Sequence, residues 1–177
     1  MGIKDFFTKK VSYSNQPVSQ SLSSLVPGAN AQTKYNLSNR GVQVSDADIQ
    51  AFRPLLYGEV SNRTPDKQAL EANVIFNTAL NRVKAYNERG QKKTLSDVLA
   101  MPKQYQAYGG AQYNAYSNPP DAVALAKKKK IDDIVNKIHD QIKYGQYEDN
   151  TQGAYYYVHD PKTSKITYDN MRPLFAK

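Results

Sequence analysis

The chain has 177 residues, enough for one domain of ordinary size and a tail, and its net charge at pH 7 is +8. It contains no cysteine and two histidines, His139 and His159, which excludes disulfides and cysteine-based zinc sites, and we predict no metal and no cofactor. No apolar run reaches the ~18 residues of a membrane span, so none is predicted.

The first 44 residues differ from the rest in composition. They are rich in serine, asparagine and glutamine, they show no sustained hydrophobic periodicity, and they hold five Lys/Arg against one Asp. Such a segment buries too little apolar surface to offset the entropy of ordering it. We therefore predict a flexible basic arm over 1–44 and a compact domain over 45–177. The first ten residues are too polar for a signal-peptide core, so no secretion signal is expected.

A first helix is predicted to begin at Ser45. Ser45 is a favoured N-cap, and Asp48 follows at the third helical position. Apolar residues then recur at helical spacing, at Ile49, Phe52, Leu56 and Val60. Pro54 falls within this pattern and should kink the helix or shift its start, because it lacks a backbone donor and crowds the previous turn.

A second, longer helix is predicted from Thr64-Pro65-Asp66 to about Glu88. Its first residues supply an N-cap, a proline at the first helical position and an acid in the first turn. The apolar stripe consists of Ala72, Ile75, Phe76, Ala79, Leu80 and Val83. A polar stripe at Asn73, Asn77 and Asn81 is either a solvated face or a face turned toward the cleft expected to hold Glu59.

The remaining elements are shorter or follow a tyrosine-rich segment. Residues 94–99 predict a short capped helix, 101–117 an irregular stretch, and 118–145 a third major helix. The residues of that helix predicted to be buried are Val123, Ile131, Ile134, Val135, Ile138 and Ile142. Residues 154–158 and 165–168 predict two strands joined by a turn. The predicted fold is therefore α+β but mostly α, a helical domain with a small β-hairpin.

Glu59, at the predicted end of the first helix, is the main candidate for chemistry. A carboxylic acid delivers a proton to a leaving group only if it is still protonated at working pH. At a helix C-terminus Glu59 faces the negative end of the dipole, and neighbouring apolar residues add desolvation, so its ionised form is expected to be disfavoured. The alternative is an ordinary surface glutamate at a helix end.

Short motifs follow one another along the predicted domain. They are Tyr57-Gly58-Glu59, Asn81-Arg82-Val83, Gln104-Tyr105, and Asp149-Asn150-Thr151-Gln152-Gly153-Ala154 with its following tyrosines. In order and spacing, over residues 46–163, this series resembles the cell wall hydrolase family that includes the spore-cortex-lytic enzymes. The chain departs from that family at Pro54, at Asn150 and Gln152, and at Asp160, which stands where the family has an asparagine before a proline. We do not expect the family's usual secretion signal and wall-binding repeats in this chain.

The resemblance implies a lysozyme-like fold, similar to that of the lytic transglycosylases, with Glu59 as the one essential glutamate. The implied substrate is bacterial peptidoglycan, cleaved between N-acetylmuramic acid (MurNAc) and N-acetylglucosamine (GlcNAc) by a lytic transglycosylase or a muramidase. The residues expected to bind it are Gln104, Tyr105, Asp149, Thr151, Tyr155 and Tyr156. The transglycosylase route needs no second carboxylate beside Glu59.

A hydrolytic route would need a second carboxylate at ~5–5.5 Å or ~6.5–9.5 Å from the first. Asp149 and Asp160 are the candidates, although an Asx turn is the favoured role for Asp149. Because strand residues alternate faces, Tyr155 and Tyr157 should share one side and Tyr156 the other, so at least one of the three is expected in the core.

Two classes of function stay open. The first is a virion-associated bacteriophage lysin, a glycosidase found in the virion or in the host cytoplasm before release, with 1–44 expected to contact other virion or tail proteins. The second is a non-enzymatic virion structural or nucleic-acid-binding protein that keeps the fold, which the basic charge would suit. Lys127–Lys130 are expected to form a solvated face, with attraction to anionic wall polymers as the alternative. The intact motif ending in Glu59 favours the enzyme over nucleic-acid binding.

Overall fold

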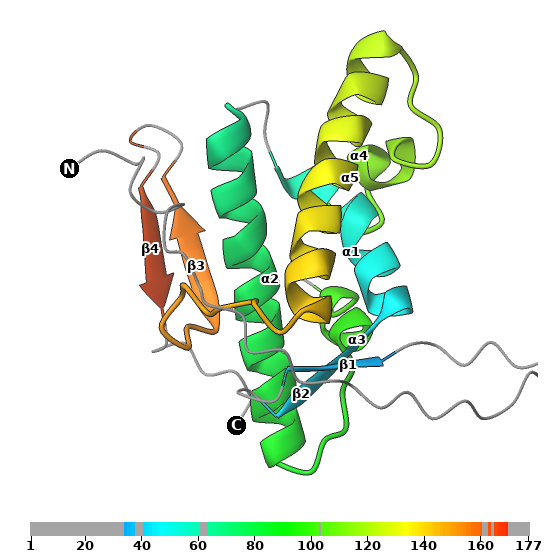
Figure 1. Ribbon diagram of the computed structural model, residues 1–177. Helices are drawn as coiled ribbons and strands as arrows, with labels where there is room; N and C mark the ends of the chain where they lie inside the picture. Colours follow the sequence, from blue (N-terminus) through cyan, green and yellow to red (C-terminus); the bar gives the residue numbers. More distant parts are fainter. Residues whose placement is uncertain are drawn as a thin grey trace, which may run out of the picture. The chain divides into compact units, whose positions relative to one another are not determined.

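The computed structural model describes residues 34–37, 41–60, 64–102, 104–160, 163 and 165–169. Every described residue belongs to one compact unit, Gln32–Lys177. Its elements (Figure 1) are β1 (Lys34–Leu37), β2 (Val42–Ser45), α1 (Asp46–Glu59), α2 (Pro65–Glu88), α3 (Leu95–Leu99), α4 (Ala111–Ala115), α5 (Ala122–Lys143), β3 (Tyr156–His159) and β4 (Ile166–Asp169). The fold is α+β and mostly α, as predicted. In the described ranges, no helix has the length and apolar character needed to cross a membrane.

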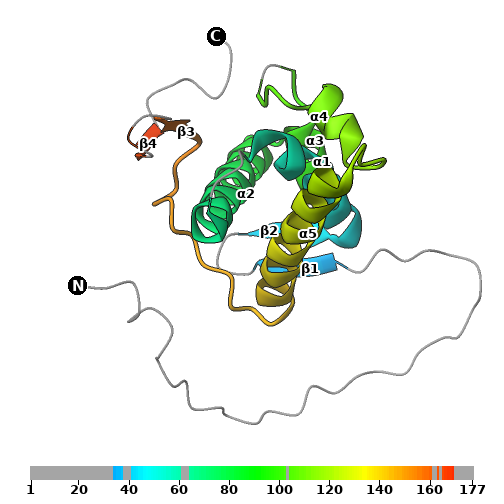
Figure 2. The same cartoon turned by 90° about the horizontal axis from the view of Figure 1, so that it is seen from above.

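Helix α1 is packed between the other helices of the described core. It contacts α2, α3, α4, α5 and strand β2, and Figure 2 shows it from above among α2, α3 and α5. Its apolar side chains, Ile49, Phe52, Leu55 and Leu56, are fully buried. The ring of Phe52 meets that of Phe76 in α2 edge to face, with 4.9 Å between the ring centroids. This packing fixes the end of α1, where Glu59 lies.

The start of α1 is fixed by a reciprocal cap that also reaches α3. Ser45 Oγ accepts a hydrogen bond from the Asp48 backbone N–H, and Asp48 Oδ2 accepts one from the Ser45 N–H at 2.9 Å. The other oxygen, Asp48 Oδ1, accepts hydrogen bonds from the backbone N–H and the hydroxyl of Ser96. One buried carboxylate therefore joins two helix starts. The predicted start at the Ser45 cap is confirmed, and Pro54 lies inside α1 without shifting it.

The folded unit begins before the predicted boundary at residue 45. Strands β1 and β2 pair antiparallel and bury Leu37, Val42 and Val44 in the core. The predicted arm is therefore too long at its C-terminal end, while residues 1–33 lie outside the described residues. The sequence did not predict these strands because each has only four residues and lies in a segment rich in serine and asparagine. An alternation of apolar and polar residues this short is a weak signal for a strand.

The one hairpin predicted from the sequence is present, with β3 paired antiparallel to β4. Two other expectations are wrong. Residues Ala111–Ala115 form α4 inside the stretch expected to be irregular, and Val123, expected to be buried, is 74% exposed. The buried residues of α5 begin only at Ile131, because the first turns of α5 border a hollow that Tyr57 and Gln68 also line.

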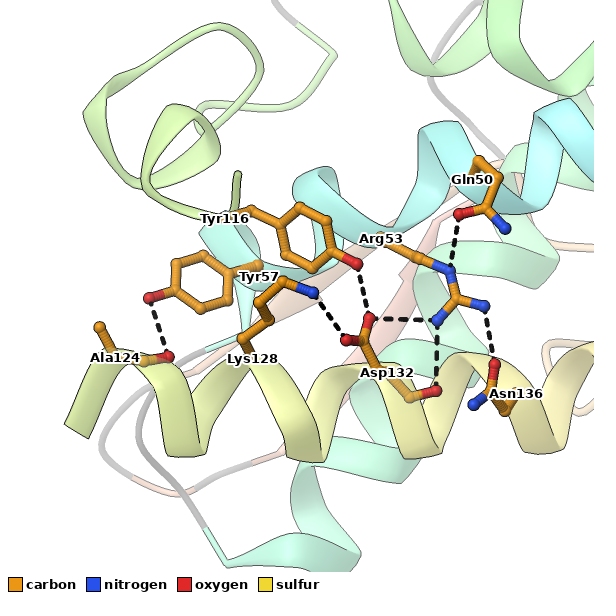
Figure 3. Close-up of polar contacts among 8 residues, drawn as sticks. All are labelled: Gln50, Arg53, Tyr57, Tyr116, Ala124, Lys128, Asp132 and Asn136. Carbon is orange, nitrogen blue, oxygen red and sulfur yellow. Dashed lines mark hydrogen bonds and ion pairs between the residues drawn. The ribbon is translucent and has the colours of Figure 1, made fainter. Parts of the chain in front are cut away.

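A charged network joins α1 to α5 (Figure 3). Asp132 Oδ1 accepts hydrogen bonds from Arg53 Nη1 at 3.1 Å and from the Tyr116 hydroxyl, and Oδ2 accepts one from Lys128 Nζ at 2.8 Å. Arg53 also donates to Asn136 Oδ1 at 2.7 Å. Burial acts to raise the pKa of Asp132, but the three donors outweigh it and hold that pKa below its usual value.

The run Lys127–Lys130 is only partly the solvated face that was expected. Lys129 and Lys130 are exposed, whereas Lys127 and Lys128 are half-buried. Lys127 Nζ lies 4.5 Å from the ring centroid of Tyr57, and Lys128 Nζ lies 4.2 Å from that of Tyr116. Burial lowers the pKa of Lys127. Half of the run therefore holds α5 to its neighbours.

We expect Asp132→Asn to lower the free energy of unfolding by ~2 kcal/mol, because Arg53 and Lys128 lose a partly buried carboxylate. Folding lowers the pKa of Asp132, so this contribution is present above the unfolded-state value and is lost as pH falls through the folded-state value. Urea unfolding of wild type and variant should therefore converge below pH 3.8, the ordinary value for this group. The exposed neighbour offers a control, Asp133→Asn, and an equal loss there would contradict the role of Asp132.

Candidate functional site around Glu59

Glu59 is the last residue of α1, and its side chain is half-buried. Its Oε1 accepts a hydrogen bond from the backbone N–H of Ala107 at 2.8 Å. Among the described residues, no cation lies within ion-pair distance of this carboxylate. A single backbone donor therefore orients the side chain, and within the described part of the chain no salt bridge neutralises it.

The approach of residue 107 to the end of α1 requires Gly58. A Cβ at Gly58 would lie 2.5 Å from the Cβ of Ala107, which is closer than two nonbonded carbon atoms come in proteins. Tyr57 precedes the glycine and is buried, with its ring edge to face against Tyr116. Within the Tyr57-Gly58-Glu59 motif, the tyrosine thus anchors the helix end and the glycine admits the segment that reaches Glu59.

A buried arginine gathers three of the residues predicted to bind the substrate. Arg82 in α2 is 3% exposed, and its guanidinium donates from Nη1 to Gln104 Oε1 and from Nη2 to the Tyr105 hydroxyl at 2.6 Å. The guanidinium carbon also lies 5.1 Å from the ring centroid of Tyr105 and 5.4 Å from that of Tyr156. The second and third motifs of the sequence therefore meet, and Tyr156 of β3 joins them.

Two tyrosine hydroxyls lie in the electric field of Glu59. Burial raises the pKa of Tyr105, and Glu59 adds to this effect while Arg82 opposes it. Burial also raises the pKa of Tyr157, with Tyr105, Glu59 and Glu71 acting in the same direction. Both phenols stay protonated at neutral pH and can donate hydrogen bonds. Tyr157 also packs against the core, which agrees with the expectation that at least one tyrosine of this strand does so.

The other three predicted binding residues gather beside Asn81, the sequence neighbour of Arg82. Asp149 Oδ1 accepts hydrogen bonds from the backbone N–H and the hydroxyl of Thr151, which is an Asx turn. Thr151 is fully buried, and its hydroxyl oxygen accepts a hydrogen bond from Asn81 Nδ2 at 3.1 Å. Asp149 and Tyr155 line a hollow of about 340 Å³ together with Asn81. Thr151 therefore shapes this loop, whereas Asp149 and Tyr155 border open space.

The asparagine stripe of α2 fixes the same loop. Asn77 Nδ2 donates to Asn150 Oδ1 at 2.9 Å, and Asn81 Nδ2 donates to the carbonyl of Ala154 at 3.0 Å. Asn77 is fully buried and Asn81 is 7% exposed. The solvated face is therefore the wrong description of these two residues, because both are buried, and Asn81 also lines the hollow beside Asp149. They hold the 148–154 loop against the helix.

The two candidates for a second carboxylate are engaged in turns. Asp149 Oδ2 accepts a hydrogen bond from the backbone N–H of Gly153 at 3.2 Å, which leaves both of its oxygens bound within its own loop. Asp160 Oδ2 accepts one from the Thr163 hydroxyl at 2.7 Å, in the turn between β3 and β4. Within the described residues, no group of three His, Asp or Glu side chains is placed to hold a metal ion.

The sequence placed Arg82 in one motif and Tyr157 among the tyrosines that follow another, but it gave neither residue a role in the site, and it did not point to the N–H of Ala107. Arg82 carries a weak signal, since it is a cation between the apolar positions Leu80 and Val83 of an amphipathic helix. Tyr157 is one of three consecutive tyrosines, and alternation alone does not say which face meets Glu59. The donor at Ala107 belongs to the backbone, so no residue type reveals it.

No protein-family model, no curated protein and no solved structure matches this chain. The family resemblance drawn from the motifs therefore stays a prediction, and the function has to be inferred from the chain's own geometry.

We expect Gly58→Ala to lower the free energy of unfolding by about 1–3 kcal/mol, because the new methyl group overlaps that of Ala107. The double variant Gly58→Ala/Ala107→Gly removes the opposing methyl group and should recover most of the loss relative to Ala107→Gly alone. Chemical denaturation of the four proteins measures this coupling. Additive effects in the double variant would show that the contact at position 107 does not control the fit.

Proposed function

We propose that this protein is a peptidoglycan-degrading glycosidase that cleaves between MurNAc and GlcNAc as a lytic transglycosylase. The observation that carries the proposal is the Glu59 carboxyl group, half-buried at the end of a buried helix and oriented by the Ala107 N–H at 2.8 Å. Among the described residues it has no ion-pair partner, so its second oxygen is available to a substrate. The four motifs that resemble the cell wall hydrolase family support the same assignment.

In this mechanism Glu59 acts first as an acid and then as a base. It donates its proton to the glycosidic oxygen as the bond from that oxygen to C1 of MurNAc breaks. The carboxylate then accepts the proton of the MurNAc 6-hydroxyl while O6 bonds to C1. The products are an anhydro-muramic end and a GlcNAc 4-hydroxyl, and Glu59 is again protonated. No water is consumed.

The surroundings of Glu59 suit this route better than hydrolysis. A hydrolase needs a second carboxylate to act as a nucleophile or to activate water. Asp149 and Asp160 are the sequence candidates, and the described hydrogen bonds of both close turns. Tyr105 is 7% exposed and its hydroxyl is bonded to Arg82, so it serves as an anchor rather than a sugar ligand. The half-buried phenol of Tyr157, whose pKa is raised by burial and by Glu59, can instead donate a hydrogen bond to a sugar oxygen.

We further propose that the enzyme is a bacteriophage lysin that reaches the wall from a virion or from the host cytoplasm. The motif resemblance and the net charge of +8 support this setting, since the wall carries anionic polymers. Export of the intact chain by the host secretion machinery would contradict it.

A second candidate function is non-enzymatic binding of a phosphodiester polymer, nucleic acid above all. It is favoured by a hollow of about 750 Å³ between the β1–β2 hairpin and the C-terminal end of α2. Three lysines line it, Lys34, Lys92 and Lys93, together with the amide side chains of Asn36, Gln43 and Asn87. Such lysines would bind phosphates in a salt-dependent way.

The deciding experiment is mass spectrometry of the sugars that wild type and Glu59→Gln release from purified peptidoglycan. We expect anhydro-muramic ends from wild type and a rate lowered by ~10²–10⁴-fold in the variant, because glutamine cannot transfer the proton. The melting temperature should not change, since the glutamine oxygen can still accept the Ala107 N–H. Glu148→Gln, at an exposed carboxyl group, should cleave like wild type.

Each other result has a defined meaning. Reducing ends would show hydrolysis and direct the search to a second carboxylate. No release from several wall types, combined with salt-sensitive DNA binding that is lost in a Lys34, Lys92 and Lys93 triple alanine variant, would replace the enzyme with the second candidate.

A further inference from the structure

Arg82 is a buried cation whose described partners are all uncharged. Its Nε donates to the backbone carbonyl of Thr78 at 3.3 Å, and its two terminal nitrogens donate to Gln104 and Tyr105. Among the described residues, no carboxylate lies within 4.0 Å of its guanidinium. Burying a charge without a counter-ion is unfavourable unless its hydrogen bonds are all made. The arrangement therefore depends on a rigid set of acceptors around the guanidinium.

Two of those acceptors belong to the segment that orients Glu59. Gln104 and Tyr105 bind Arg82, and Ala107, two residues further on, donates its N–H to Glu59. Two residues of chain span at most ~7 Å. The position of the Ala107 N–H is thus set by a guanidinium on one side and by the end of α1 on the other.

The same guanidinium also orders the aromatic groups beside the acid. The ring centroid of Tyr156 lies 5.4 Å from the guanidinium carbon. Its neighbour in β3 is Tyr157, whose pKa is raised by Glu59 and lowered by Arg82. A planar fork that donates in several fixed directions can hold these groups together, whereas the single ammonium group of a lysine cannot.

We infer that Arg82 is a positioning residue for Glu59, acting through the 104–107 segment. The inference rests on the proposed function, in which Glu59 transfers the proton. It also changes the expected role of Gln104, which the sequence assigned to substrate binding. Gln104 instead serves as an anchor for Arg82, so that its loss disturbs the chemical step more than sugar binding.

The first test compares Arg82→Lys with Lys84→Ala, a change at an exposed cation on the same helix. Hydrogen exchange of the Ala107 amide, followed by NMR, should become at least ~10-fold faster in Arg82→Lys and stay unchanged in Lys84→Ala. Peptidoglycan turnover should show kcat lowered by ~10–100-fold with KM nearly constant, because the acid is misplaced rather than removed. Unchanged exchange and unchanged kcat in folded Arg82→Lys would overturn the inference.

The second variant, Gln104→Met, covers the case in which Arg82→Lys does not fold. It removes one acceptor and keeps a side chain of similar length on a half-buried position. We expect faster Ala107 exchange and a several-fold lower kcat. A higher KM with normal exchange would return Gln104 to substrate binding and overturn the positioning role.

The exchange measurement needs no activity, so it separates the two proposals. If the wild type cleaves no wall material while Ala107 exchange still responds to Arg82→Lys, the proposed function fails and the positioning geometry stands. If the wild type is active and neither kcat nor exchange responds, the enzyme stands and the role of Arg82 is wrong.

Discussion

The burial of α1 among four helices and a strand is the constraint on which the position of Glu59 depends. Asp48 fixes its first turn through bonds to Ser45 and Ser96, and Arg53 fixes its middle through Asp132. A helix held at two points cannot rotate or slide, so its last residue leaves the core in one direction. The segment carrying Ala107 meets that end because Gly58 leaves room for it. Every proposed step at Glu59 follows from this fixed helix end.

Local signals account for the parts of the fold that could be predicted. The caps at Ser45 and Thr94 use partners three residues away, and both appear as reciprocal caps in the structure. Proline at the first helical position likewise identified the start of α2. The hydrogen bond from Ser96 to Asp48 joins segments far apart in the chain, and Leu37 is buried by packing against the core. No pattern in the neighbouring sequence predicts either contact. Tertiary contacts are what the sequence could not supply.

In the candidate site, too, local sequence identified some residues but not the contacts that define their roles. Glu59, Gln104 and Tyr105 could be selected because their types and order resemble a known family, but type does not separate a sugar ligand from an anchor. The structure ties Gln104 and Tyr105 to Arg82 and ties Thr151 to Asn81, so polar side chains that looked available are bonded to one another. Tyr157, which the sequence did not assign to the site, is close enough to Glu59 for the carboxylate to raise its pKa.

The donor to Glu59 is a main-chain N–H, and every amino acid except proline carries one. Position 107 is therefore under no pressure to keep a polar side chain, and what restricts it is the space left by Gly58. Among related sequences, we expect this contact to be visible only as two small residues, at positions 58 and 107, that change together. A search of an alignment for invariant polar residues would therefore find Glu59 and miss the Ala107 N–H that orients its carboxyl group.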